Sequence, residues 1–232
     1  PHWSSECAFG SMVNGTAPGR RIRGVDYARS EAAAVTARDV LDLAHARCHY
    51  RQSVDLFEFW ASHQADGDRP RPPDFDPLDV PALLPHLYLL ERHDGRLRYR
   101  VSGEAVNSLF GTQHTGRYLD QVVPPAIYEI VSPYYERVFD GTICLFKGNV
   151  VLPNRDFLSF ERVLVPVIRQ DRLLLLGCLS LSNTAQLRDD PPDPLPDGFH
   201  FFVHDLTRGN TESRYVPVTA EAFRRPGTGD CA

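Results

Sequence analysis

A turn near the middle of the chain constrains the fold more strongly than any other feature. Asp94-Gly95 lies between two runs of strand character, 87–93 and 96–103. Asp-Gly accommodates the positive φ angles of a type I′ turn, a common two-residue link between antiparallel strands. In the second run apolar residues alternate with arginines, so one face of this strand is expected to be buried and the other charged. The chain is therefore expected to build an antiparallel sheet that contains this hairpin.

The order of the remaining elements narrows the topology further. Short helices are expected over 104–110, around 118–123 and from Pro125 to about Phe139. Three strands are then expected, at 142–152, 157–168 and 172–182. Short helices are not stable alone and need a sheet face to cover. The sequence thus predicts an α+β fold, with a five-stranded antiparallel sheet, short helices over one face and additional N-terminal helices.

The chain is expected to divide into four segments. They are an irregular leader (1–29), an N-terminal helical segment (30–66), a sheet domain (70–183) and a C-terminal extension with a proline-rich linker and a partly disordered tail (184–232). Within the extension, residues 199–203 can form either a strand or a separate apolar patch. Gly-Ser-Met at 10–12 is a common scar of expression vectors, so a native and a vector-derived origin both stay open for residues 1–11.

Composition and charge exclude several functional classes. The formal net charge is −5, and the longest apolar run, Leu173–Leu179, is far shorter than the roughly 20 residues of a membrane helix. No basic segment followed by an apolar one marks a secretory signal. The five cysteines are scattered and form no CxxC pair, which disfavours a disulfide framework and a zinc site. A cytoplasmic protein is expected, with no nucleic-acid partner, no membrane partner and no metal centre.

Several stretches of the middle region carry a family resemblance. They are Phe59-Trp60, Pro70-Arg71-Pro72, Asp74-Phe75-Asp76-Pro77, Leu83-Leu84-Pro85-His86-Leu87, Leu89-Leu90-Glu91, Tyr99-Arg100-Val101-Ser102-Gly103, Gly111 through Thr115-Gly116-Arg117, and Glu161-Arg162-Val163-Leu164-Val165-Pro166. In this order they resemble the PAS domain, and in particular the bacterial PAS family found as small stand-alone proteins in alphaproteobacteria. The resemblance spans about 58–182. It implies a concave sheet with a helical flap that holds a small ligand, and no catalytic residue.

Aromatic and apolar residues of the helical region and of the adjacent strands are the candidates for lining a ligand pocket. They are Tyr99, Phe110, Tyr118, Ile127, Tyr134, Cys144 and Phe146. Apolar walls with a few polar groups are the usual composition of a small-molecule site. The same residues are equally compatible with a filled core, so both interpretations stay open.

Two charged residues are candidates for an ion pair or an anion site. Glu161 lies in an otherwise apolar row of its strand and needs a partner if that row is buried, and Arg100 of the hairpin is the expected partner. Arg100 also belongs to a strip with Arg96 and Arg98. This strip predicts either an anion site that uses guanidinium contacts or a solvated face of the sheet.

The expected function is a non-catalytic sensory or regulatory module that binds a small ligand. It would signal through protein–protein contacts, with a partner protein or a second copy engaged by the N-terminal helices. No cofactor is expected. A haem- or flavin-bearing PAS sensor is one alternative, for which His86, His93 and His114 are available as axial ligands. A hydrolase of small molecules that uses the arginine strip and Glu161 is the alternative from a different class.

Overall fold

A single antiparallel sheet organises the described part of the chain, which comprises residues 36–64, 70–152, 155–181 and 198–223 of the computed structural model. Its strands are β1 (Leu87–His93), β2 (Arg96–Ser102), β3 (Thr142–Leu152), β4 (Arg155–Arg169), β5 (Arg172–Leu181), β6 (Gly198–Asp205) and β7 (Asn210–Pro217). They lie in the order β2-β1-β5-β4-β3-β6-β7. The predicted hairpin is confirmed, because Asp94 and Gly95 both have positive φ angles, 51° and 72°. The predicted α+β class is confirmed as well.

The expectation of five strands is wrong, because the described sheet has seven. Strands β6 and β7 come from the C-terminal extension. β6 pairs antiparallel with β3 from Thr142↔Asp205 to Gly148↔Phe199. The apolar run at 199–203 is therefore a strand and not a separate patch. Its addition covers the edge that β3 would otherwise expose, and exposed edges favour unwanted pairing.

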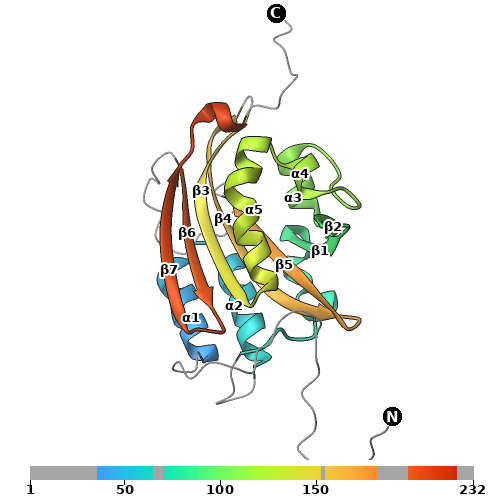
Figure 1. Cartoon of the computed structure of the whole chain (residues 1–232), viewed down its shortest axis with the longest axis vertical. Coiled ribbons are helices and arrows are strands. Elements are labelled where there is room, and N and C mark those ends of the chain that lie inside the picture. Colours follow the sequence, from blue (N-terminus) through green and yellow to red (C-terminus); the bar gives the residue numbers. More distant parts are fainter. Residues whose placement is uncertain (1–35, 65–69, 153–154, 182–197, 224–232) are drawn as a thin grey trace, which may run out of the picture.

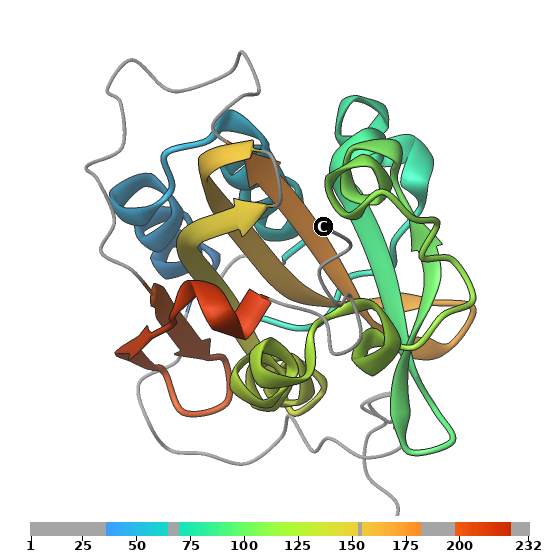
Figure 2. The same cartoon turned by 90° about the horizontal axis from the view of Figure 1, so that it is seen from above.

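Three helices cover one face of the sheet, which we call the flap face (Figures 1 and 2). They are α3 (Glu104–Phe110), α4 (Leu119–Val122) and α5 (Pro125–Phe139). α3 ends at Gly111, whose φ of 64° provides a left-handed cap. α5 starts at Pro125 and continues through Pro133 as one helix. The flap that the sequence predicts is thus present, with α5 as its main element.

Two N-terminal helices cover the opposite face, which we call the outer face. They are α1 (Ala37–Arg47) and α2 (Arg51–Ser62). α1 begins with a capping box in which Thr36 and Asp39 bond each other's backbone N–H. The first residues of the predicted N-terminal helical segment, 30–35, lie outside the described residues. Three short 3₁₀ helices complete the description: η1 (Pro77–Asp79), η2 (Pro81–His86) and η3 (Ala220–Phe223). No helix among the described residues is long and apolar enough to cross a membrane.

The sheet separates two apolar cores, because alternate residues of each strand face opposite sides. On β4, Phe160 and Leu164 belong to the flap-face core, whereas Val163 and Val165 pack on the outer face with α2. Trp60 of α2 is fully buried there, and its indole N–H donates to the Pro166 carbonyl at 2.9 Å. The N-terminal helices are thereby attached to the sheet by both apolar packing and hydrogen bonds.

Candidate functional site

A cluster of hydroxyl groups and one guanidinium lies in the flap-face core, beneath α5. The Arg162 guanidinium donates to the Tyr135 hydroxyl at 2.7 Å, and the Tyr135 and Tyr88 hydroxyls are 3.1 Å apart. Burial raises the pKa of Tyr88 strongly and keeps its hydroxyl neutral, with Tyr135 adding to the shift and Arg162 opposing it. The cluster therefore joins α5, β1 and β4 through two tyrosine hydroxyls and a buried guanidinium.

The Tyr88 ring owes its position to a residue without a side chain. Tyr88 of β1 lies directly opposite Gly177 of β5 in the antiparallel register. A Cβ atom at Gly177 would lie only 2.1 Å from Cζ of Tyr88. Glycine at 177 is thus what allows the ring to cross the neighbouring strand and reach Tyr135.

The structure brings five of the predicted pocket residues together in the flap-face core. They are Tyr99, Ile127, Tyr134, Cys144 and Phe146. Each is buried, and they pack with aromatic neighbours: the Phe146 and Phe201 rings stack with centroids 5.1 Å apart. Burial raises the pKa of the Cys144 thiol, so this cysteine is a neutral apolar group. These five residues therefore belong to one buried apolar core, and Tyr134 also lines the groove described below.

The remaining two predicted pocket residues are Tyr118 and Phe110. Tyr118 is half-buried beside the hairpin, where its hydroxyl lies 3.0 Å from Nδ1 of His93 and the Arg96 guanidinium covers its ring. Phe110 ends α3, and its side chain lies outside those that the structure describes.

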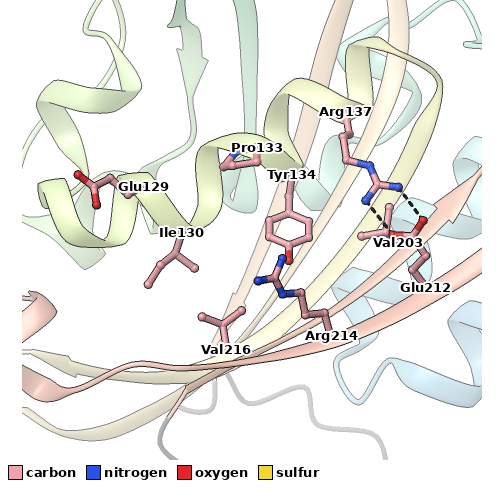
Figure 3. A pocket seen from close by; sticks show the side chains of 9 residues that line it. All are labelled: Glu129, Ile130, Pro133, Tyr134, Arg137, Val203, Glu212, Arg214 and Val216. Carbon is pink, nitrogen blue, oxygen red and sulfur yellow. Dashed lines mark hydrogen bonds and ion pairs between the residues drawn. The ribbon is translucent and has the colours of Figure 1, made fainter.

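An open groove of about 340 Å³ lies next to the filled core, between α5 and the β6–β7 hairpin (Figure 3). Its apolar lining comes from Ile130, Pro133, Val203 and Val216, and its polar lining from Glu129, Tyr134, Arg137, Glu212 and Arg214. Only Tyr134 was expected from the sequence to line a pocket. The groove is thus a second, surface site that adjoins the predicted one through a shared residue.

Charge in the groove is unevenly distributed. Arg137 binds Glu212 with two hydrogen bonds, of 3.0 and 3.3 Å, and this contact lowers the pKa of the Glu212 carboxyl. The Arg214 guanidinium lies beside the Tyr134 hydroxyl (Figure 3). Burial raises the pKa of Tyr134, although Arg214 opposes the shift. The Arg214 side chain is exposed, so it presents a cation above the apolar floor of the groove.

The expected pairing of Arg100 with Glu161 is wrong. Glu161 faces the outer side of the sheet, where its carboxylate lies 3.2 Å from Lys147 and accepts a 2.7 Å hydrogen bond from the His49 N–H. Arg100 instead contacts Glu91, at 3.4 Å. The physical reason is strand order, because β1 and β5 lie between β2, which carries Arg100, and β4, which carries Glu161.

The arginine strip of β2 is largely engaged in ion pairs. Arg96 forms a two-bonded pair with Asp120, at 2.8 and 2.5 Å. Arg98 and Arg100 both bind the buried carboxylate of Glu91. Each arginine of the strip therefore has a carboxylate partner, and Arg98 and Arg100 share the same one, Glu91.

The candidate axial histidines are dispersed. His86 contacts the Leu179 carbonyl at 3.2 Å, His93 contacts Tyr118, and buried His114 lies with its ring 5.2 Å from the Tyr99 ring. Within the described ranges, no three His, Cys, Asp or Glu side chains are grouped as a metal site would require.

Comparison with known families decides the identity of this fold. The profile of the PAS domain matches residues 49–180, which is more than half of the 232 residues. The chain belongs to the PAS domain family. Searches among curated proteins and among solved structures found no match. PAS domains are in general sensory and signalling modules, and the hairpin β6–β7 lies beyond the matched part of this one.

Two groups of site residues in this PAS protein were not predicted from the sequence. Arg162 directly follows Glu161, and in a strand consecutive side chains face opposite sides. That parity was a usable signal, since placing Glu161 on one face sends Arg162 to the other. Arg137 and Arg214 had no comparable signal, because the groove exists only once β7 is placed beside α5.

Proposed function

We propose that this PAS protein is a non-catalytic sensory module that binds a small organic anion in the groove between α5 and β7. The observation that carries the proposal is the pairing of an apolar floor with the exposed Arg214 guanidinium. A guanidinium binds a carboxylate through two parallel hydrogen bonds. The floor of Ile130, Val203 and Val216 would hold an apolar body. The favoured ligand class is therefore an aromatic or aliphatic carboxylate.

The groove is better suited to binding than to catalysis. Its lining includes no histidine, cysteine or serine, the usual nucleophiles and proton carriers. Of its two carboxylates, Glu212 is already bound to Arg137. These features support a binding site rather than the alternative of a hydrolase.

Adjacent residues offer a route from the groove to the N-terminal helices. Tyr134 lines the groove, and Tyr135, the next residue of α5, bonds Arg162 inside the core. Glu161, the residue before Arg162, faces the outer side of the sheet. There its carboxylate accepts hydrogen bonds from the N–H groups of His49 and Tyr50, just before α2. A ligand that moves α5 would thus change the position of α1 and α2 on the sheet. We propose these two helices as the contact surface for a partner protein or a second copy. Such a shift requires unequal ligand affinity for two states.

Phenylacetate is a suitable probe, because it joins a carboxylate to one aromatic ring. Titration into ¹⁵N-labelled protein should give saturable shifts of the amides of Ile130, Tyr134 and Val216. Arg214→Gln should weaken this binding about tenfold or more, the effect of losing a charge-assisted contact. Arg208→Gln is the matched control, since Arg208 lies in the β6–β7 turn, is exposed and is outside the groove; it should bind as the wild type does.

The same titration tests whether ligand binding in the groove changes the N-terminal helices. At saturation the amides of His49 and Tyr50 should also shift, and Tyr135→Phe should abolish that distant effect while leaving binding intact. Binding without any shift of the His49 and Tyr50 amides would overturn the proposed route from the groove to the N-terminal helices. An absence of saturable binding would overturn the groove as the ligand site. An absorbance spectrum and a native mass of the purified protein test the alternative: a visible band or an added haem or flavin mass would favour a cofactor sensor.

A further inference from the structure

Three arginines of the outer face converge on one buried carboxylate. Glu91 of β1 has a side chain that is only 2% exposed, and its Oε1 accepts from Arg98 Nη2 at 2.5 Å. Its Oε2 lies 3.4 Å from Arg100 Nη1 and 3.0 Å from Arg172 Nη2. Arg98 and Arg100 are on β2, and Arg172 begins β5. One negative charge on β1 is thus shared by three positive charges on the two strands that flank it, β2 and β5.

The other two arginines of the β1–β2 hairpin have carboxylates of their own. Elsewhere on the hairpin, Arg96 has its own carboxylate in Asp120, and Arg92 has two, Glu136 and Asp140. For Arg98, Arg100 and Arg172, the described residues supply no carboxylate other than Glu91. The cluster therefore carries an excess of two positive charges.

The unused donors of the cluster can be reached from solvent. Each guanidinium has five N–H groups, and Arg100 and Arg172 each direct a single nitrogen at Glu91. Their side chains are 31% and 51% exposed. α2 packs over β4 and β5, toward the middle of the sheet, whereas Arg98 and Arg100 lie on β2 at the edge of the sheet.

Glu91 holds the three guanidiniums in place. Burial raises the pKa of Glu91, but the hydrogen bond from Arg98 and the charges of Arg172, Arg98 and Arg100 outweigh burial and lower it overall. The carboxylate is therefore ionised at neutral pH. It fixes one edge of each guanidinium and directs the others outward, which reduces the entropy lost when a further anion binds.

We propose that Arg98, Arg100 and Arg172 form a binding site for the dianion of a phosphate monoester, with Glu91 as its positioning residue. A phosphate monoester carries close to two negative charges at neutral pH, which matches the excess of the cluster. Its three terminal oxygens can accept from three guanidiniums at once, whereas a carboxylate has only two oxygens and one charge. The site is separate from the proposed groove, and neither depends on the other.

Phenyl phosphate tests the site as a free phosphate ester, and a short glycine peptide with one central phosphoserine tests a phosphorylated protein segment as the source. The readout is the side-chain Nε–Hε resonances of Arg98, Arg100 and Arg172, with circular dichroism to verify folding. Saturable shifts are expected at about pH 7.5. Because the second phosphate pKa is near 6, binding should weaken several-fold at about pH 5. A peptide that binds about tenfold more tightly than phenyl phosphate would assign the source to a protein.

Matched variants decide whether the cluster is responsible. Arg100→Gln and Arg172→Gln should each weaken phosphate binding about tenfold, the effect of one charge-assisted contact. Arg96→Gln, on the same strand but paired with Asp120, should leave it unchanged within a factor of two. Equal loss in all three variants would overturn the proposal, as would the absence of saturable shifts with either probe.

Discussion

The Lys147 ammonium lies 3.2 Å from the Glu161 carboxylate, and this pair holds both ends of the junction between α1 and α2. Lys147, the single lysine of the chain, donates to the Arg47 carbonyl at the end of α1. Glu161 accepts the N–H groups of His49 and Tyr50 at the start of α2. A cation therefore meets a helix C-terminus and an anion meets a helix N-terminus, the arrangement that helix dipoles favour. The buried pair makes the position of the N-terminal helices specific.

Neutralising Glu161 should destabilise the protein strongly. Glu161→Gln leaves Lys147, which is only 5% exposed, without its carboxylate, and removing one member of a buried pair costs roughly 3–5 kcal/mol of unfolding free energy. Urea denaturation followed by circular dichroism measures the change. Glu58→Gln is the control, because Glu58 is an exposed ion-pair partner of Arg51 and should cost less than about 1 kcal/mol. Equal stability of Glu161→Gln and wild type would show that the pair is energetically irrelevant.

Adding a methyl group opposite Tyr88 should also destabilise the protein. The new Cβ in Gly177→Ala would meet the Tyr88 ring at 2.1 Å, and overpacking of a core typically costs about 1–3 kcal/mol. The double variant with Tyr88→Leu should be less unstable than the two single effects summed, since the smaller side chain relieves the clash. Strictly additive unfolding free energies would mean that the contact does not cause the loss.

Stability should fall as the pH drops below about 6.5, in part because of His204. Burial lowers the pKa of this β6 histidine, and the nearby carboxylates of Asp39 on α1 and Asp205 on β6 oppose the shift without cancelling it. The unfolded chain therefore takes up a proton at a higher pH than the folded chain does, so acidification favours unfolding. Urea midpoints from pH 7.5 to 5 should decline less steeply for His204→Gln. An unchanged slope would assign the decline to other groups, such as His200, whose pKa burial also lowers.

The C-terminal hairpin should be attached mainly by apolar stacking and not by its ion pair. Phe201 of β6 is fully buried and stacks on Tyr134 with ring centroids 3.8 Å apart, so Phe201→Ala should cost roughly 3–5 kcal/mol. Arg137→Gln breaks only a partly exposed pair with Glu212 and should cost about 0.2–1 kcal/mol. Differential scanning calorimetry of both variants checks the order, which would be reversed if the ion pair dominated.

Local chemistry explains which features the sequence by itself determined. Asp94-Gly95 specifies its turn because few residues tolerate two successive positive φ angles, and Gly111 ends α3 for the same reason. The alternation of apolar and polar residues, together with the turn residues, likewise predicted strands β3, β4 and β5 and the helices of the flap face. These signals are confined to a few neighbouring residues, so a single sequence carries them completely.

The tertiary structure alone decided which side chains meet. If the row of Glu161 is buried, the strand pattern predicted Arg100 as its partner. The row is buried, but the order of the strands places Glu161 against Lys147 and Arg100 against Glu91. The sixth and seventh strands and the groove beside α5 arise because the extension pairs with β3, a contact between residues 51 to 63 positions apart. Contacts between residues so far apart in the sequence depend on the order of the strands and on how the helices pack on the sheet. The local periodicity of a strand or helix does not encode that arrangement.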